Sequence, residues 1–316
     1  MTTYEIAPER AALHGSFSRE VPPVLTIDPG DTVRYQTLDA AWNVAPRRSR
    51  VPAEQPRKFA PRDLERDSGH ALCGPVAIRG AVPGMTLAVR IDAVRPAAWG
   101  WTSAGGWESR VNARLGVVQI AERMHLWELD ADTQIARNQD GFTVPLRPFM
   151  GVMGMPPDEP GWHSTTPPRI WGGNIDCREL VAGSTLYLPI PVAGALFSVG
   201  DGHAAQGDGE VSCTAIECPM IRVELTFDLL PDLRLTTPRA HTPAGWLTLG
   251  FHEDLHEASM IALNAMLDLM GEQYGLSRQD ALTLASVAVD LRVTQLVNGG
   301  VLGAHALLPH GRLTPP

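Results

Sequence analysis

The stretch Ile221–Leu229, with the sequence IRVELTFDL, decides the fold class because its side chains alternate in character. Its odd-numbered positions are apolar, and its even-numbered positions are charged or carry a hydroxyl. Such alternation is typical of a strand buried on one face, which favours antiparallel sheet. The stretch Leu87–Ala93 shows the same pattern, and Pro83-Gly84 provides a turn directly before it. The chain up to about residue 250 is therefore expected to be β structure.

The pattern changes in the last part of the chain. The stretch Glu253–Met270 is an almost wholly apolar helix pattern, and Gly271 is expected to end the helix. Ser277 and Asp280 have capping-box spacing, which predicts a second helix through about Val289. An extended segment is expected to follow. A largely apolar helix must be buried on most sides, against the sheets or in an oligomer interface.

These patterns predict a mainly β (α+β) fold in a single unit of residues 1–316. A sandwich-like or barrel-like antiparallel β body is expected over about residues 1–250, with a helical α/β portion over about residues 251–316. No internal repeat and no clear linker divides the sequence.

Composition and charge exclude several classes of protein. The formal net charge of −9 argues against a nucleic-acid groove, which needs clustered Lys and Arg. The sequence has no apolar stretch approaching the roughly 18 residues of a membrane span, and no secretory signal is recognisable at its beginning. Its four cysteines form no CxxC pair. We expect a cytoplasmic protein with reduced thiols and neither nucleic-acid nor membrane partners.

The loop Gly200–Glu210, with the sequence GDGHAAQGDGE, concentrates the residue types that bind metals. Carboxylates and imidazole suit Zn²⁺, Mn²⁺ and similar divalent ions, so Asp201 and His203 are candidate ligands. Glycines in the loop allow a ligand to approach the backbone closely. The alternative is a polar hairpin loop without a bound ion.

Glu217 follows this loop in a stretch, Val211–Cys218, that is predicted to be a strand. Glu217 shares one side of that strand with small apolar residues, so its carboxyl is expected to point inward. A buried carboxyl must be protonated, paired or bound to a cation, which makes Glu217 a candidate general base or metal ligand. The alternative is that the opposite face is buried and Glu217 faces solvent.

Two further polar clusters are candidates. Gly172–Asp176, GGNID, is either a simple turn or a strand edge that delivers Asp176 into the site. His70 stands before a predicted strand and is either a ligand or a structural histidine. No GxSxG, HExxH or Walker-type motif is present, and neither Cys73 nor Cys177 has a sequence context that predicts activation.

Longer strings of the sequence resemble the acetamidase/formamidase family in the family's order, over nearly the whole chain. The strings that carry the resemblance are GHALCGPVAIRGAVPGMTLAVRI (Gly69–Ile91), PFMGVMGMPP (Pro148–Pro157), GGNIDCREL (Gly172–Leu180) and GSTLYLPIPVAGALFSVGDGHAAQGDGEVSCTAIE (Gly183–Glu217). Met85 stands where the family usually has Asp, and Cys73 where Thr is common.

The resemblance implies hydrolysis of a short linear amide, such as formamide or acetamide, to ammonia and a carboxylate. It also implies a sandwich-like body joined to an α/β portion, assembled as a homo-oligomer. At the matching positions it implies that four residues lie at the active site, with His70 and Asn174 nearby: Asp176, Asp201, His203 and Glu217.

The combined hypothesis is a metal-assisted amidase. A divalent metal, expected to be zinc, is held by Asp201, His203 and a third residue, for which Asp176 and His70 compete. Glu217 takes a proton from water and returns it to the leaving nitrogen. The expected substrate-binding residues are His70, Asn174, Trp42 and Trp171, with a tryptophan limiting the acyl group.

Three alternatives remain open at this point. The loop could be a structural cation site in a β-rich binding or assembly protein. The enzyme could hydrolyse a different C–N bond. Cys73 could act as a covalent nucleophile.

Overall fold

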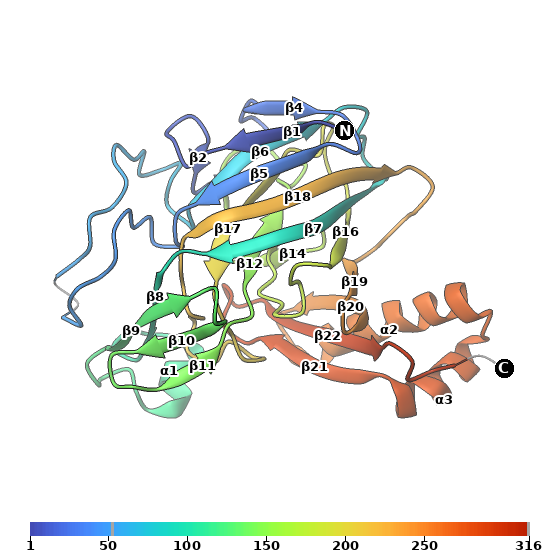
Figure 1. The fold of residues 1–316 in the computed structure, drawn as a ribbon. Coiled ribbons are helices and arrows are strands. Elements are labelled where there is room, and N and C mark those ends of the chain that lie inside the picture. The colour runs from blue at the N-terminus through green and yellow to red at the C-terminus, as the bar shows by residue number, and fades with distance from the viewer. Residues whose placement is uncertain (52–53, 315–316) are drawn as a thin grey trace.

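The computed structural model describes residues 1–51 and 54–314, and β sheets form its main body (Figure 1). The largest sheet has nine strands. In spatial order they are β1 (Thr3–Ile6), β5 (Thr32–Thr37), β18 (Met220–Leu230), β7 (Thr86–Pro96), β16 (Thr185–Pro189), β19 (Arg239–Thr242), β20 (Gly245–His252), β22 (Leu302–Pro309) and β21 (Asp290–Gln295). Of its neighbouring pairs, only β1 and β5 run parallel.

A second sheet has seven strands and supplies much of the site described below. Its members are β14 (Pro168–Arg169), β15 (Gly172–Asn174), β12 (Phe149–Gly154), β17 (Phe197–His203), β6 (Leu72–Ile78) and β2 (Leu13–His14), with β4 (Leu25–Ile27) paired to β6. Smaller pairings are a four-stranded sheet of β11 (Thr143–Pro145), β10 (Ile135–Asn138), β9 (Arg123–Asp130) and β8 (Trp99–Ala104), and a pair of β13 (His163–Ser164) with β3 (Ser16–Phe17).

The alternating stretches form the strands that were expected. β7 and β18 pair antiparallel along their length, and Val223, Leu225 and Phe227 turn their side chains into the core. The ring centroids of Phe197 on β17 and Phe227 on β18 lie 5.1 Å apart, so the two large sheets pack face to face at this contact. The mainly β, sandwich-like prediction is confirmed.

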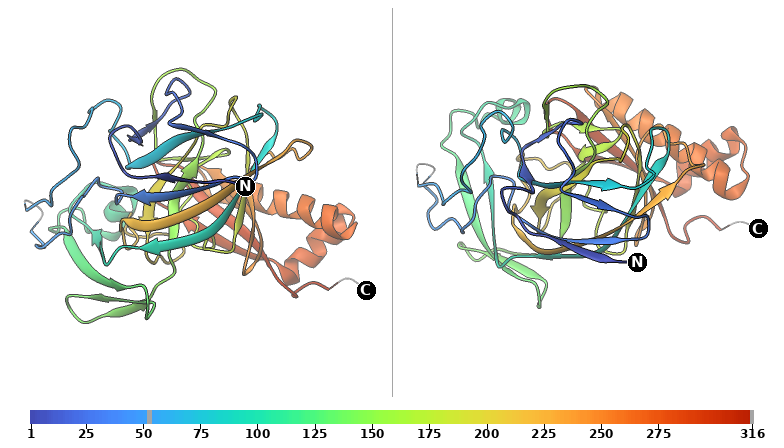
Figure 2. Two further views of the ribbon diagram at one scale, coloured as in Figure 1. Left: turned by 45° about the horizontal axis from the view of Figure 1, so that its top comes forward. Right: turned by 90° about the horizontal axis from the view of Figure 1, so that it is seen from above.

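Three helices complete the described structure: α1 (Arg110–Leu115), α2 (Leu255–Tyr274) and α3 (Arg278–Ala288). In both views of Figure 2, α2 and α3 lie on the opposite side of the molecule from the four-stranded sheet. Ser277 caps α3 by accepting a hydrogen bond from the Asp280 backbone N–H, as the capping-box spacing predicts. The extended segment also forms, as β21.

One expectation about α2 is wrong. The helix continues past Gly271 and ends at Tyr274, because Gly275 adopts the left-handed conformation and donates its N–H to the Gly271 carbonyl. Within the single chain α2 is not buried on most sides, so the alternative that an oligomer interface covers the rest of the helix stays a prediction. It packs one face against β20 and β22, where Ala258 and Ala262 are fully buried, and it leaves Met260 exposed. Within the described residues, no helix is long and apolar enough to cross a bilayer.

Candidate active site

β17 brings Asp201 and His203 to one side of the seven-stranded sheet, because residues two apart in a strand share a face. Asp201 has a left-handed backbone, with φ 61°, which is costly for a residue with a side chain. The neighbouring strand β12 places Gly151 against this spot. A Cβ added at Gly151 would lie 2.4 Å from Asp176 Oδ1 and 2.5 Å from Asp201 Oδ2, so only glycine leaves room for these carboxylates.

Glu217 joins the cluster from an irregular segment. Val211–Cys218 is not a strand, and Val211 is exposed, so the strand prediction is wrong. Glu217 forms an isolated bridge instead: its N–H donates to the Trp101 carbonyl at 2.9 Å, and its carbonyl accepts from the Trp101 N–H at 3.0 Å. The side chain is nevertheless buried, with the residue 3% exposed, which rules out the solvent-facing alternative.

His203 is the centre of the cluster. Its Nε2 lies 3.3 Å from Asp201 Oδ1 and 3.4 Å from Glu217 Oε2. On the other side of the ring, Nδ1 lies 2.9 Å from Gln206 Oε1 and 3.7 Å from Asp176 Oδ1. If Nδ1–H donates to Gln206 Oε1, a neutral ring turns its Nε2 lone pair toward the two carboxylates, which is favourable only with a cation between them.

Asp176 arrives from the loop after β15, again with a left-handed backbone of φ 50°. Its Oδ2 accepts a hydrogen bond from Asn298 Nδ2 at 2.5 Å, and the Gln206 side chain donates to its carbonyl. Asp176 is 1% exposed, so the simple-turn alternative does not describe it. Asn174, the last residue of β15, is also buried, and its carbonyl accepts a hydrogen bond from Asn298 Nδ2 at 3.1 Å.

A cavity of about 280 Å³ opens onto these groups. The expected residues among its lining are His70, Asn174, Asp176, Asp201 and Glu217. His70 is held there by Thr165, whose Oγ1 lies 2.8 Å from Nδ1 and accepts from the backbone N–H.

Neither expected tryptophan lines this cavity. Trp42 is 1% exposed, with its indole N–H donated to the Gly69 carbonyl, and Trp171 packs against the main core. Trp101 lines the cavity instead, and it donates its indole N–H to Asp39 at 2.9 Å. The sequence contains no signal that separates Trp101 from the other tryptophans, since its position depends on the pairing of β8 with the segment around Glu217.

Glu210 is a second residue that sequence reasoning did not single out. It lies within the acidic loop, is 6% exposed, and lines the cavity with Asn298. With Asp176 and His203 it forms one of two described groups whose ligand atoms lie within 4.8 Å of one another, and Asp201, His203 and Glu217 form the other. The density of acids in the loop was the available signal, but spacing alone could not show which of them is buried.

Burial and neighbouring charge shift the pKa values of the cluster in different directions. Burial raises the pKa of Glu217 to about 7. Burial also raises the pKa of Asp176, and it raises that of Glu210 well above its usual value. For His203 and Asp201, burial opposes the charged form, but attraction to neighbouring charges prevails. Glu217 and Asp201 raise the pKa of His203, and His203 and His70 lower the pKa of Asp201.

The donor set suits a divalent cation. Within the described residues, four buried side-chain oxygens at this site lack a hydrogen-bond partner: Asn174 Oδ1, Asp176 Oδ1, Glu210 Oε2 and Glu217 Oε2. Buried oxygens without partners are costly, and a cation among them would satisfy them. Carboxylates combined with one imidazole are ligands for zinc and similar ions.

The same fold is found in solved structures of other proteins. A predicted acetamidase/formamidase from Thermoanaerobacter tengcongensis superposes with a TM-score of 0.81 at 27% identity, covering 98% of this chain and 96% of that one. An acetamidase from Bacillus halodurans gives a TM-score of 0.83 at 25% identity, covering 96% and 97%. A formamidase from Methylophilus methylotrophus is 26% identical over 255 residues, 65% of this chain and 61% of its own length, so the match spans under two thirds of that relative.

Fold, site and similarity together place the protein among amidases, hydrolases that act on C–N bonds. The Acetamidase/Formamidase family profile matches residues 2–163 and 161–244, which is most of the chain. The chain belongs to the Acetamidase/Formamidase family.

Proposed function

We propose that this protein hydrolyses a short linear carboxamide, of the formamide or acetamide type, to ammonia and a carboxylate. The observation that carries the proposal is the buried cluster of Asp201, His203 and Glu217, of which Asp201 and Glu217 line a cavity of about 280 Å³. The names of the similar proteins, formamidase and acetamidase, support the same substrate class.

Asp201 and His203 would hold a divalent cation, with Asp176 as the third donor. Their meeting around Gly151 supports this set, because a single added methyl would touch all three side chains. A cation bound there would polarise the amide carbonyl and make water a stronger nucleophile near neutral pH. We propose zinc, because imidazole with carboxylates is a common zinc donor set.

Glu217 is the proposed general base. Its Oε1 accepts a hydrogen bond from the Ala215 N–H at 2.9 Å, which leaves Oε2 free toward the cavity. A base with a pKa near 7 can take a proton from the attacking water and return it to the leaving nitrogen, which then departs as ammonia. Asn174 Oδ1, which has no partner within the described structure, would accept a hydrogen bond from the substrate NH₂, and His70, which lines the same cavity, would contact the substrate.

Ammonia release from formamide, acetamide, propionamide and urea tests the proposal, measured before and after chelation and after return of Zn²⁺. Full activity in a metal-free preparation would contradict it. The Glu217→Gln variant separates the two roles open to this residue. If Glu217 is the base, the variant should lose about 10²–10⁴-fold in kcat and keep its bound cation. If Glu217 is a ligand instead, the cation content should fall as well.

We also propose that residues 1–316 act as one unit, in a cytoplasmic homo-oligomer. The exposed Met260 on α2, which is 38% exposed, and the neighbouring Ile170, 44% exposed, support an interface on that side. Light scattering of the purified protein tests the oligomer, and a monomer at micromolar concentration would contradict it.

A further inference from the structure

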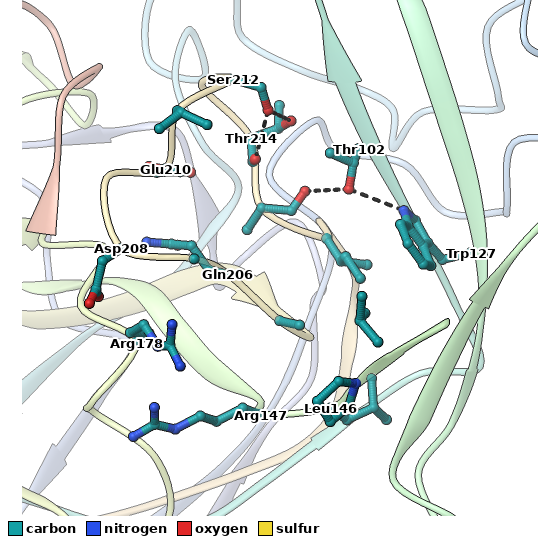
Figure 3. A pocket seen from close by; sticks show the side chains of 17 residues that line it. Thr102, Trp127, Leu146, Arg147, Arg178, Gln206, Asp208, Glu210, Ser212 and Thr214 are labelled. Atoms are coloured by element: carbon teal, nitrogen blue, oxygen red, sulfur yellow. Dashed lines mark hydrogen bonds between the residues drawn. The ribbon is translucent and has the colours of Figure 1, made fainter. Parts of the chain in front are cut away.

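A second cavity, of about 510 Å³, adjoins the first (Figure 3). Glu210 and Thr214 line both cavities, so the two meet at the loop that carries these residues. The catalytic proposal does not use the second cavity. Its volume lies within the range of about 300–1,000 Å³ typical of small-molecule sites.

The walls of the second cavity are mainly apolar. Trp127 on β9 closes one side, with its indole N–H donated to Thr102 at 3.2 Å. The other apolar lining residues include Val144, Pro145, Leu146, Val211 and Ile216. Figure 3 shows that Arg147, Arg178 and Asp208 gather at the end away from Trp127. The cavity therefore combines an aromatic and aliphatic wall with a cationic end.

The two arginines at that end differ in their partners. Arg147 forms an ion pair with Glu179, a carboxylate that Arg292 also contacts at 3.4 Å. Arg178 is half-buried and has no hydrogen bond or ion pair with any residue of the described ranges 1–51 and 54–314. Its Nε is buried without an acceptor. A guanidinium nitrogen removed from water without an acceptor is unfavourable, and a carboxylate is the partner that fits its planar fork.

We propose that this cavity binds a small organic carboxylate with an apolar body. The carboxylate would accept hydrogen bonds from Arg178, and the body would cover Trp127 and Leu146. Formate or acetate would be too small to contact the apolar wall, so the ligand has a larger hydrocarbon part. Among the residues that line the cavity, Asp208 and Glu210 carry the carboxyl groups that oppose such an anion, and Asp208 is the exposed one. The inference does not depend on the proposed catalytic roles.

Isothermal titration calorimetry tests the proposal, with phenylacetate as probe and 2-phenylethanol and acetate as partial analogues. Phenylacetate should bind saturably and more tightly than either analogue. Arg178→Gln should raise the Kd of phenylacetate at least about tenfold, because a charge-assisted hydrogen bond is lost. Asp208→Asn should lower the Kd of phenylacetate, because the opposing negative charge is removed.

Arg79→Gln is the matched control, since Arg79 pairs with Asp28 at 2.7 Å on the surface and lines neither cavity. It should leave the Kd of phenylacetate unchanged. Absence of saturable binding overturns the proposal, and so does equal affinity in wild type and Arg178→Gln, which would place phenylacetate elsewhere. Thermal melting checks that Arg178→Gln is folded. If Arg178→Gln is not folded, the test rests on Asp208→Asn, because Asp208 is exposed and its replacement should not disturb the fold. An unchanged Kd of phenylacetate in Asp208→Asn then counts against the site.

Discussion

Replacing Gly151 by alanine is the sharpest test of the candidate active site. The added methyl would lie 2.4 Å from Asp176 Oδ1, 2.5 Å from Asp201 Oδ2 and 2.9 Å from His203 Cε1. Since real Cβ contacts essentially never fall under 3.0 Å, the distance between the new Cβ and Asp176 Oδ1 must grow by at least 0.6 Å, the difference between 3.0 and 2.4, through movement of the carboxylate or of the backbone at position 151. All three side chains are buried, so any displacement disturbs the contacts that hold them in the cluster.

The displacement allows an estimate of the loss. A misplacement of about 1 Å costs about 10²-fold in rate, so a shift of this size should lower kcat/KM by about tenfold to 10²-fold. Overpacking should also destabilise the fold by about 1–3 kcal/mol. Ammonia release gives kcat/KM, elemental analysis gives the bound cation, and urea unfolding gives the free energy of unfolding.

Gly271→Ala is the control that makes the same chemical change in α2. There the nearest outside atom to the new methyl is the Leu276 carbonyl oxygen at 3.5 Å, an ordinary contact. The control should keep wild-type activity, and its free energy of unfolding should rise by about 0.5–1 kcal/mol, because alanine is more stable than glycine in a helix interior. The reasoning is refuted if Gly151→Ala keeps both its cation and its kcat/KM within about twofold of wild type.

Three more predictions follow from the buried polar groups. Burial lowers the pKa of His14 from 6.5 to about 4, so only the unfolded state takes up this proton in that window. Stability should therefore fall by about 3 kcal/mol as the pH drops from 6.5 to 4. Urea unfolding of His14→Gln should show a smaller fall, and an unchanged fall would count against the assignment. Gln206→Leu removes the acceptor from His203 Nδ1 and should weaken cation affinity by about 10–100-fold, measured by metal titration, whereas Gln206→Glu keeps an acceptor and should lose less. Because burial raises the pKa of Glu217 to about 7, a base at this position is ionised above that pH. The kcat/KM should then decline as the pH falls below about 7, and a flat profile between pH 5 and 8 would contradict a base with this pKa.

The strands were predictable because their cause is local. A strand with one buried face shows its burial as alternation, so β7 and β18 are recognisable from a few residues. The capping box before α3 is equally local. The end of α2 was mispredicted because Gly271 and Gly275 are both plausible stops, and the choice depends on which glycine takes the left-handed conformation.

The candidate site was predictable only in part. Asp201, His203 and Asp176 stand in glycine-rich segments whose composition suggests ligand binding, and they meet at Gly151. Glu217 is buried as expected, but through its bridge to Trp101 and not through strand alternation. The acid-rich loop pointed to Glu210 only in a general way, and Asn298 had no recognisable local signal, because each reaches the cluster through loops placed by distant strands.

The sequence by itself therefore determined the β-rich body, the terminal helices and the chemistry of the Gly200–Glu210 loop, since each depends on neighbours along the chain. Tertiary structure alone decided which side chains surround His203 and which tryptophan lines the cavity. It brings Trp101 and Asn298 to the cavity and buries Trp42 away from it. The physical reason is that a site joins residues far apart in sequence, and their meeting depends on how the sheets pair and pack, which local periodicity does not encode.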